Sequence, residues 1–368
     1  MDFGSDGEGL SLAGRYFLDE IKECKNCAFV PSSSSNTMDI FAIIVLIFVL
    51  VSSISASSNA AVVTENFNVV DYGAAGDGTT DDSQAFLKAW KATCNTATGI
   101  PTVIIPERKT FLVNPTVFSG SCKARRIDFL LLGSIVAPTS PSTWKGLDPS
   151  QWLAFSGVSG LNITGSGRID GRGDDCVSIG DYTSDIKIDH VNCGPGHDIP
   201  DRSTLLVIYS IGSLGRGGNS VQVEKIYVNN VNFTRTTNGA RIKTWQVGTG
   251  FVRGVTFENL KFTEVENPII IDQNYCSVRG ACKELKIVCL SKQTGVHISN
   301  VTYNELFGTS NTDVAINLNC SRSVACTGIK LQSIQLTSVK SGQKITSNCN
   351  NAHGIASGVI KPNSCLSK

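Results

Sequence analysis

Charged residues are scarce in this chain: Asp, Glu, Lys and Arg together make up 17% of its 368 residues. Positive charge is not in excess either, because 32 Lys and Arg residues stand against 31 Asp and Glu. A near-neutral chain does not have the broad basic face by which many proteins bind nucleic acid, although a local basic groove remains compatible with it. Few charges, together with many Val, Ile and small polar residues, favour an all-β fold over a helical one.

The chain's conspicuous apolar run, residues 40–51, is too short to span a bilayer comfortably. Its length is typical of the apolar core of a signal peptide, and Met38 stands just before it as a natural start. We therefore expect residues 1–37 to be a spurious or disordered extension and residues 38–60 to be a cleaved signal peptide. Residues 61–368 would then be the folded domain. The alternative is an uncleaved membrane anchor.

Cysteine, by contrast, is abundant, with 13 residues in all. Only Cys24 and Cys27 precede the apolar run, and such cysteine usage is typical of a secreted protein stabilised by disulfides. Cys289 is left over when the other ten cysteines of the folded part are paired, and the alternative for the whole set is buried free thiols. Short, regular spacings predict the disulfides Cys94/Cys122, Cys176/Cys193, Cys276/Cys282, Cys320/Cys326 and Cys349/Cys365.

Acceptor sequences for N-linked glycans agree with a secretory route, although each occurs easily by chance. They lie at Asn162, Asn232, Asn300 and Asn319.

One helix and a series of repeats organise the rest of the chain. Residues 83–94 have helical spacing, with Phe86, Leu87 and Trp90 on one face, and Thr80 or Asp81 is placed to cap them. From Ser159 onward, segments of alternating apolar and polar residues recur at intervals of about 25–40 residues, as in stacked repeats. Hairpin turn signals between them are scarce, which disfavours a sandwich. The pattern predicts a single-stranded right-handed parallel β-helix whose N-terminal end is capped by the helix.

The adjacent carboxylates Asp174 and Asp175 are candidates for acid–base chemistry. A regular strand would direct them to opposite faces, but Gly173 permits a bend that keeps them together. Their mutual repulsion would keep one of them protonated to a higher pH, and a protonated carboxyl group is what a glycosidic leaving oxygen requires. A disulfide between Cys176 and Cys193 would bring His197 close to them. The alternative is an ordinary solvated turn.

Arg241 and Lys243 alternate along a predicted strand and therefore share a face. Such a pair can bind a sugar carboxylate, with the arginine making the bidentate contact, or it can simply be two surface charges. Together with the paired carboxylates, it predicts a hydrolase that acts on an anionic polysaccharide.

The sequence resembles the plant polygalacturonases of glycoside hydrolase family 28 over most of residues 67–368. The resemblance implies a secreted right-handed β-helix that hydrolyses the α-1,4 bonds of homogalacturonan with inversion, without a metal or cofactor. The matching segments are FNVVDYGAAGDGTTDDSQAFLKAW at 67–90, GSGRIDGRG at 165–173, GDDCVSIG at 173–180, CGPGH at 193–197, SIGSLGRG at 210–217, TTNGARIKTWQ at 236–246 and NPIIIDQNYC at 267–276.

The same resemblance implies roles for individual residues. Asp174 looks like the general acid, Asp175 like part of the base that activates water, and His197 like the supporting catalytic histidine. The implied substrate-binding residues are Arg241, Lys243 and Tyr275. The implied protein is a monomer that acts on pectin outside the cell, in the cell wall, and binds neither nucleic acid nor, after removal of the signal peptide, a membrane.

Three departures from the family pattern stand out. An Asn-Thr-Asp motif that should precede Gly-Asp-Asp is absent, and about 75 residues near position 172, roughly three coils of a solenoid, are missing. Asn311-Thr312-Asp313 has the same letters but lies far downstream, so we regard it as a chance match. Residues 198–209 look inserted, and residues 285–291, which contain Cys289, interrupt another expected strand.

Loss of an exon and retention of intron sequence would explain all three departures. The missing motif supplies a carboxylate that helps to position the attacking water, and general-base assistance is worth about 10²–10⁴ in rate. We therefore hypothesise a polygalacturonase of reduced activity. The alternatives are a non-catalytic β-helix that binds pectin, and a hydrolase of another acidic polysaccharide such as rhamnogalacturonan.

Overall fold

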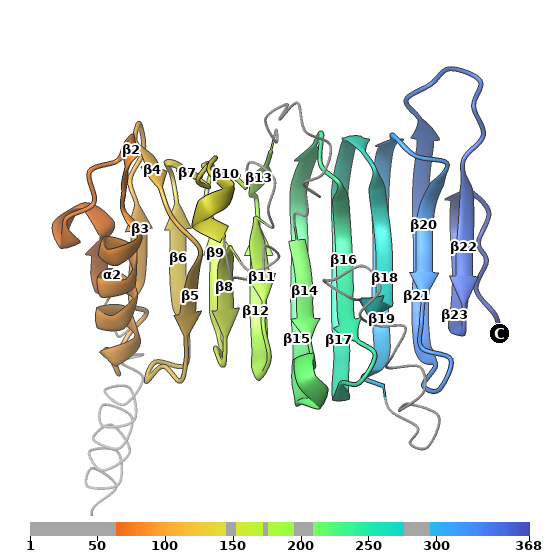
Figure 1. Cartoon of the computed structure of the whole chain (residues 1–368), viewed down its shortest axis with the longest axis horizontal. Helices are drawn as coiled ribbons and strands as arrows, with labels where there is room; N and C mark the ends of the chain where they lie inside the picture. Colours follow the sequence, from red (N-terminus) through yellow and green to blue (C-terminus); the bar gives the residue numbers. More distant parts are fainter. Residues whose placement is uncertain (1–63, 145–151, 172–175, 195–208, 276–294) are drawn as a thin grey trace, which may run out of the picture. The chain divides into compact units, whose positions relative to one another are not determined.

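The computed structural model describes residues 64–144, 152–171, 176–194, 209–275 and 295–368. Residues 62–368 form one compact unit of stacked β-coils. Two sheets run along the stack, and every strand pairing recorded in them is parallel (Figure 1). In this region, no described helix is long and apolar enough to cross a membrane. The predicted all-β parallel solenoid is therefore confirmed.

The smaller sheet has 8 described strands, one from each successive coil. They are β5 (Thr116–Ser119), β8 (Leu153–Ser156), β11 (Val177–Ile179), β14 (Tyr209–Leu214), β16 (Asn238–Trp245), β18 (Asn267–Tyr275), β20 (Val314–Asn319) and β22 (Thr346–Asn350).

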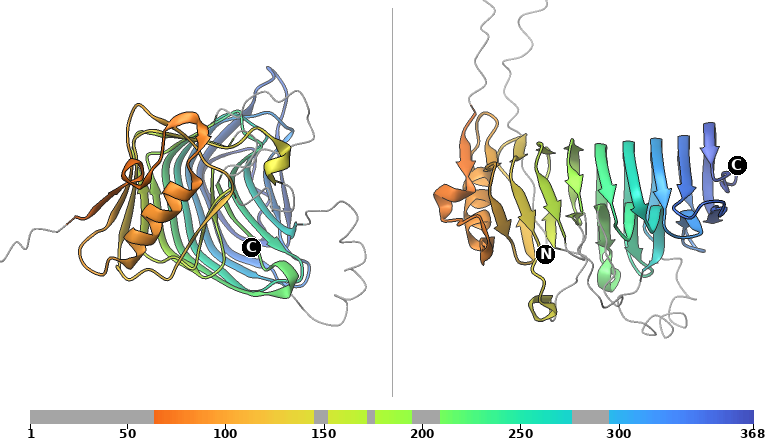
Figure 2. Two further views of the ribbon diagram at one scale, coloured as in Figure 1. Left: turned by 60° about the vertical axis from the view of Figure 1, so that its left-hand side comes forward. Right: turned by 90° about the horizontal axis from the view of Figure 1, so that it is seen from above.

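The larger sheet has 15 described strands and bends around the other sides of the coil (Figure 2). They are β1 (Asn66–Asn68), β2 (Asp77–Asp81), β3 (Thr102–Ile105), β4 (Thr110–Leu112), β6 (Ile127–Leu131), β7 (Ser134–Val136), β9 (Leu161–Thr164), β10 (Arg168–Asp170), β12 (Thr183–Asp189), β13 (Asn192–Cys193), β15 (Ser220–Thr234), β17 (Thr249–Val265), β19 (His297–Ser310), β21 (Cys326–Ser338) and β23 (Ala352–Lys361). Helical segments are α2 (Ser83–Asn95) and the short 3-10 turns η1 (Val69–Tyr72), η2 (Pro141–Trp144) and η3 (Arg216–Gly218).

The core consists of columns of apolar side chains that repeat from coil to coil. Parallel strands in register place residues of matching position directly above one another, so alternating sequences stack their apolar members inside. One buried column crosses nine strands of the larger sheet: Phe67, Val103, Phe129, Ile163, Ile188, Val228, Phe257, Tyr303 and Leu331. This is the repeat that the spacing of the sequence predicts.

Helix α2 packs on the N-terminal end of the stack, as predicted. Its Phe86 and Trp90 are buried, and the Trp90 indole nitrogen donates a hydrogen bond to the Ser119 carbonyl at 3.0 Å. Trp90 meets the ring of Phe118 edge to face at 5.4 Å, and Phe118 stacks on Phe155 at 4.9 Å. The helix thus closes the apolar column that an open coil would expose to water.

The predicted helix cap is only partly correct. Asp82, not Thr80 or Asp81, stands at the N-cap position, and its carboxylate instead accepts hydrogen bonds from the backbone of Ala75 and Gly76. Asp81 accepts the Ser83 amide at 3.0 Å. Asp82 is thus engaged by the backbone amides of the preceding loop, and the neighbouring Asp81 accepts the amide of the first turn instead.

Three predicted disulfides are confirmed: Cys94–Cys122, Cys320–Cys326 and Cys349–Cys365. The prediction of a bond between Cys176 and Cys193 is wrong for this structure, which buries both residues without joining them. Cys176 leads into the smaller sheet and its thiol donates to the Ile169 carbonyl at 3.3 Å, whereas Cys193 lies in the larger sheet in register with Ile169. Cys276, Cys282 and Cys289 lie outside the described residues.

We expect Phe118→Ala to destabilise the protein, because it opens a cavity between Trp90, Phe129 and Phe155. The free energy of unfolding, measured by denaturation in urea, should fall by about 3–5 kcal/mol. Val117→Ala is the matched control in the same strand, since Val117 is 46% exposed on the opposite face, and should change it little. Equal losses in both variants would contradict the assignment of Phe118 to the core.

Candidate active site

Strand β16 places two cations on the face of the smaller sheet that is turned away from the core. Ala240 and Ile242 point into the core with 0% exposure, so Arg241 and Lys243, which alternate with them, share the other face as predicted. Both are nevertheless buried, Arg241 to 7% and Lys243 to 0% exposure. Charges are seldom buried to this degree without a purpose, because removing them from water costs several kcal/mol.

Tyr275, the third predicted binding residue, lies at the end of the neighbouring strand β18. Its ring centroid is 5.7 Å from the Arg241 guanidinium carbon and 5.1 Å from the Lys243 ammonium nitrogen. Cations at such distances interact favourably with an aromatic ring. The structure therefore brings Arg241, Lys243 and Tyr275 together, although Tyr275 lies 32 positions after Lys243 in the sequence.

The Arg241 side chain retains hydrogen-bonding capacity. Its Nε is buried and has no hydrogen-bond partner in the described part of the chain, and the hydroxyl oxygen of Ser210, beside it in strand register, is in the same situation. An unmet buried donor on a cation costs free energy, which an anionic ligand recovers by accepting that bond. The arrangement is chemically suited to binding a carboxylate.

Asp272 adds a carboxyl group that sequence reasoning missed. It lies directly beside Lys243 in strand register and accepts the Asn274 amide at 3.0 Å. Burial raises the pKa of Asp272, against the opposing effects of that hydrogen bond and of the Arg241 and Lys243 charges. The sequence did contain a signal for this residue. Asp272 is a charged residue directly after the apolar segment Ile269–Ile271, and strand alternation turns its position away from the core.

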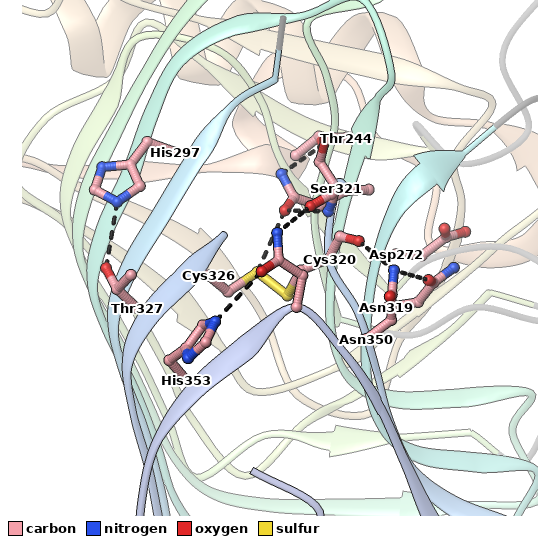
Figure 3. The surroundings of a disulfide bond; sticks show 12 residues. Thr244, Asp272, His297, Asn319, Cys320, Ser321, Cys326, Thr327, Asn350 and His353 are labelled. Carbon is pink, nitrogen blue, oxygen red and sulfur yellow. Dashed lines mark hydrogen bonds between the residues drawn. A yellow bond between two sulfur atoms is a disulfide. The ribbon is translucent and has the colours of Figure 1, made fainter. Parts of the chain in front are cut away.

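Asparagines continue the same row on the next two coils. Asn319 and Asn350 follow Asp272 in register, and the Asn350 amide donates to Asn319 at 3.4 Å and to the Cys320 carbonyl at 2.8 Å. Figure 3 shows these side chains next to the Cys320–Cys326 disulfide. The disulfide thus fixes the end of β20 beside the row.

Gln273 ties the ends of several strands together from inside the coil. It is buried, donates to the Val296 carbonyl at 2.7 Å and to the Thr244 hydroxyl at 3.5 Å, and accepts the Ser321 amide at 3.1 Å. These bonds hold the end of β16 against the end of β18. They explain why Trp245 and Tyr275 meet edge to face at 5.4 Å.

The predicted catalytic residues Asp174, Asp175 and His197 lie outside the described residues. The strands that follow them in sequence are described, and they belong to the same sheet as the basic pair. Ser178 of β11 is in register with Ser210 of β14, which in turn is in register with Arg241. Within the described ranges, no group of three or more His, Cys, Asp or Glu side chains could hold a metal ion.

The chain is similar in sequence to known proteins. The sequence profile of glycosyl hydrolases family 28 matches residues 171–365. A probable polygalacturonase of Arabidopsis thaliana is 34% identical over 397 residues, covering 85% of this chain and 82% of that protein. A polygalacturonase of Prunus persica is 33% identical over 387 residues, covering 82% and 93%. Among solved structures, the endo-xylogalacturonan hydrolase of Aspergillus tubingensis is 17% identical with a TM-score of 0.36, covering 80% of this chain and 100% of that chain.

We expect the stability difference between the wild type and Asp272→Asn to depend on pH. Because burial raises the pKa of Asp272, the folded protein keeps this proton at pH values where the unfolded chain has released it. The free energy of unfolding of the wild type, relative to that of the variant, should therefore fall as pH rises from the ordinary aspartate pKa through the raised one. Denaturation in urea at a series of pH values measures this. A difference that stays constant, or that moves in the opposite sense, would contradict it.

Proposed function

This chain belongs to family 28 of the glycosyl hydrolases, and on that basis we propose that it hydrolyses the α-1,4-galacturonosidic bonds of homogalacturonan. The single observation that supports this substrate is the buried pair of Arg241 and Lys243 against Tyr275. Homogalacturonan has a carboxylate on every sugar, and a buried guanidinium with an unmet donor matches that group in charge and geometry.

In the proposed mechanism, Asp174 protonates the glycosidic oxygen while Asp175 removes a proton from water. The water attacks the anomeric carbon from the side opposite the leaving group, so the product has the inverted configuration. His197 supports this pair. Arg241 and Lys243 hold the carboxylate of the sugar at the reacting position, and Tyr275 lines the same position.

The absence of the Asn-Thr-Asp motif leads us to propose reduced turnover. Strand β11, which follows residues 172–175, is in parallel register with both of its neighbours in the smaller sheet, since Ser178 pairs with Ala154 of β8 and with Ser210 of β14. Such continuity is compatible with the loss of whole coils. One water-positioning carboxylate fewer corresponds to a loss of about 10²–10⁴ in rate. The second candidate function, a β-helix that binds pectin without cleaving it, follows from the same missing motif together with the retained basic pair.

We also propose that the protein is secreted to the cell wall and acts as a monomer after cleavage of residues 38–60. The three disulfides support an oxidising compartment. Among the four glycan acceptor sites, Asn232 and Asn300 are exposed. The side-chain amides of Asn162 and Asn232 donate hydrogen bonds to neighbouring coils, and Asn319 accepts one, so we propose Asn300 as the site most open to modification.

We expect the wild type to release reducing ends from polygalacturonic acid, and Lys243→Met to lower kcat/KM by at least about tenfold. Methionine fills the buried position without a charge, so the loss reports the missing contact with the carboxylate. Lys330→Met, which removes an exposed lysine of the larger sheet, is the matched control and should behave as the wild type.

Fully methyl-esterified polygalacturonate is the matched substrate, because it has the same backbone without the charges. The wild type should leave it intact. Binding of oligogalacturonides without any product would select the non-catalytic alternative. Equal cleavage of charged and esterified polymer would overturn the role of the basic pair.

A further inference from the structure

A third cation, Arg216, stands near the basic pair of Arg241 and Lys243, on a turn that the mechanism does not use. Strand β14 ends at Leu214, which is in register with Thr244 of β16, and the turn η3 begins at Arg216. The Arg216 side chain is exposed, and its guanidinium carbon is 5.8 Å from the ring centroid of Trp245. This distance is within the range of a cation–π contact. The turn therefore places Arg216 at the end of the strand that bears Arg241 and Lys243.

Two aromatic rings connect Arg216 with the basic pair. Trp245 contacts both Arg216 and Tyr275, and Tyr275 in turn contacts Arg241 and Lys243. The rings of Trp245 and Tyr275 therefore connect the Arg216 cation with the cations of Arg241 and Lys243. The indole nitrogen of Trp245 is buried and has no hydrogen-bond partner among the described residues, so the contact of this ring with a ligand would be made by its partly exposed apolar face.

The backbone of the turn is closely constrained. Gly215 has φ of 75°, and a β-carbon there would lie 2.6 Å from the Gly248 α-carbon, so another residue would push the turn away from the end of β16. The Gly215 amide also donates to the carboxyl group of Asp181, whose pKa burial raises. Arg216 is therefore held in place by its immediate neighbour in sequence.

Arg216 is one of three exposed arginines, with Arg125 and Arg322, for which no ion pair with a described residue is recorded, and of these three it is the one with a recorded contact to an aromatic ring. Arg126, Arg235 and Arg253 each form an ion pair with a carboxylate, at distances of 2.9, 3.1 and 2.7 Å. Arg216 forms none with any described residue, and its recorded contact is the Trp245 ring. A guanidinium fixed by an aromatic ring and not neutralised by a neighbour is suited to bind an external anion.

We propose that Arg216 and Trp245 form a second binding subsite for an acidic sugar, next to the one at Arg241 and Lys243. The guanidinium pairs with the sugar carboxylate, and the indole contacts the apolar face of the sugar ring. In a polymer with a carboxylate on every sugar, one sugar can place its carboxylate at Arg241 and Lys243 while another sugar of the same chain places its own at Arg216. The proposal rests on the proposed function, since it takes a polyuronate as the ligand.

The experiment measures binding of oligogalacturonides of increasing length to the full-length protein by calorimetry. Arg216→Gln and Trp245→Ala are compared with the wild type and with Arg253→Gln. Arg253 is the matched control, because it is also an arginine over an aromatic ring, that of Phe251 at 4.3 Å, but lies in the larger sheet. Binding is measured without reference to turnover, so a weakly active enzyme still gives a result.

We expect the affinity of the wild type to rise when the oligomer becomes long enough to reach both subsites. Arg216→Gln and Trp245→Ala should each weaken binding of these longer oligomers by about tenfold, and that of the shortest ones much less. Arg253→Gln should match the wild type at every length. If the wild type binds oligogalacturonides and the affinity of every variant changes with oligomer length as that of the wild type does, the second subsite is refuted while the proposed function stands. If the wild type binds no oligogalacturonide at all, both are refuted.

Discussion

The parallel, in-register pairing of successive coils is the constraint on which every other feature of this protein depends. Each strand is bonded to the same position of the coils before and after it, so a residue's neighbours across the sheet come from segments about one coil away in sequence. The same register that stacks Phe257 on Tyr303 inside the coil places Arg241 beside Ser210 outside it. The apolar core and the candidate site thus depend on the same strand register, one on the inner face of the coil and the other on its outer face.

Electrostatics on the outer face of the smaller sheet are set by burial. Arg241 and Lys243 are removed from water, which makes an incoming carboxylate a favourable partner, while Asp272 beside them retains its proton to higher pH for the same reason. Tyr275 and Trp245 supply neutral surfaces with a negative ring face toward the cations. A surface of this composition favours a negatively charged ligand over a neutral one.

Local patterns predicted those features that depend on nearby residues. Helix α2 follows from its apolar spacing, and the disulfides Cys320–Cys326 and Cys349–Cys365 follow from short sequence separation. The shared face of Arg241 and Lys243 follows from strand alternation alone. The expected bond between Cys176 and Cys193 failed because spacing says nothing about how two sheets orient their thiols. Asp174, Asp175 and His197 stay predictions.

The alternation of apolar and polar residues and the length of the repeats were enough to predict a stacked β-coil with a basic pair on one of its faces. The sequence motifs were enough to predict the family. Which residues of different coils lie close together in space could not be predicted from the sequence. That Asp272 adjoins Lys243, that Gln273 ties β16 to β18, and that Trp245 meets both Tyr275 and Arg216 depend on inter-coil register and burial. These are properties of strand pairing over long separations, which local residue preferences do not encode.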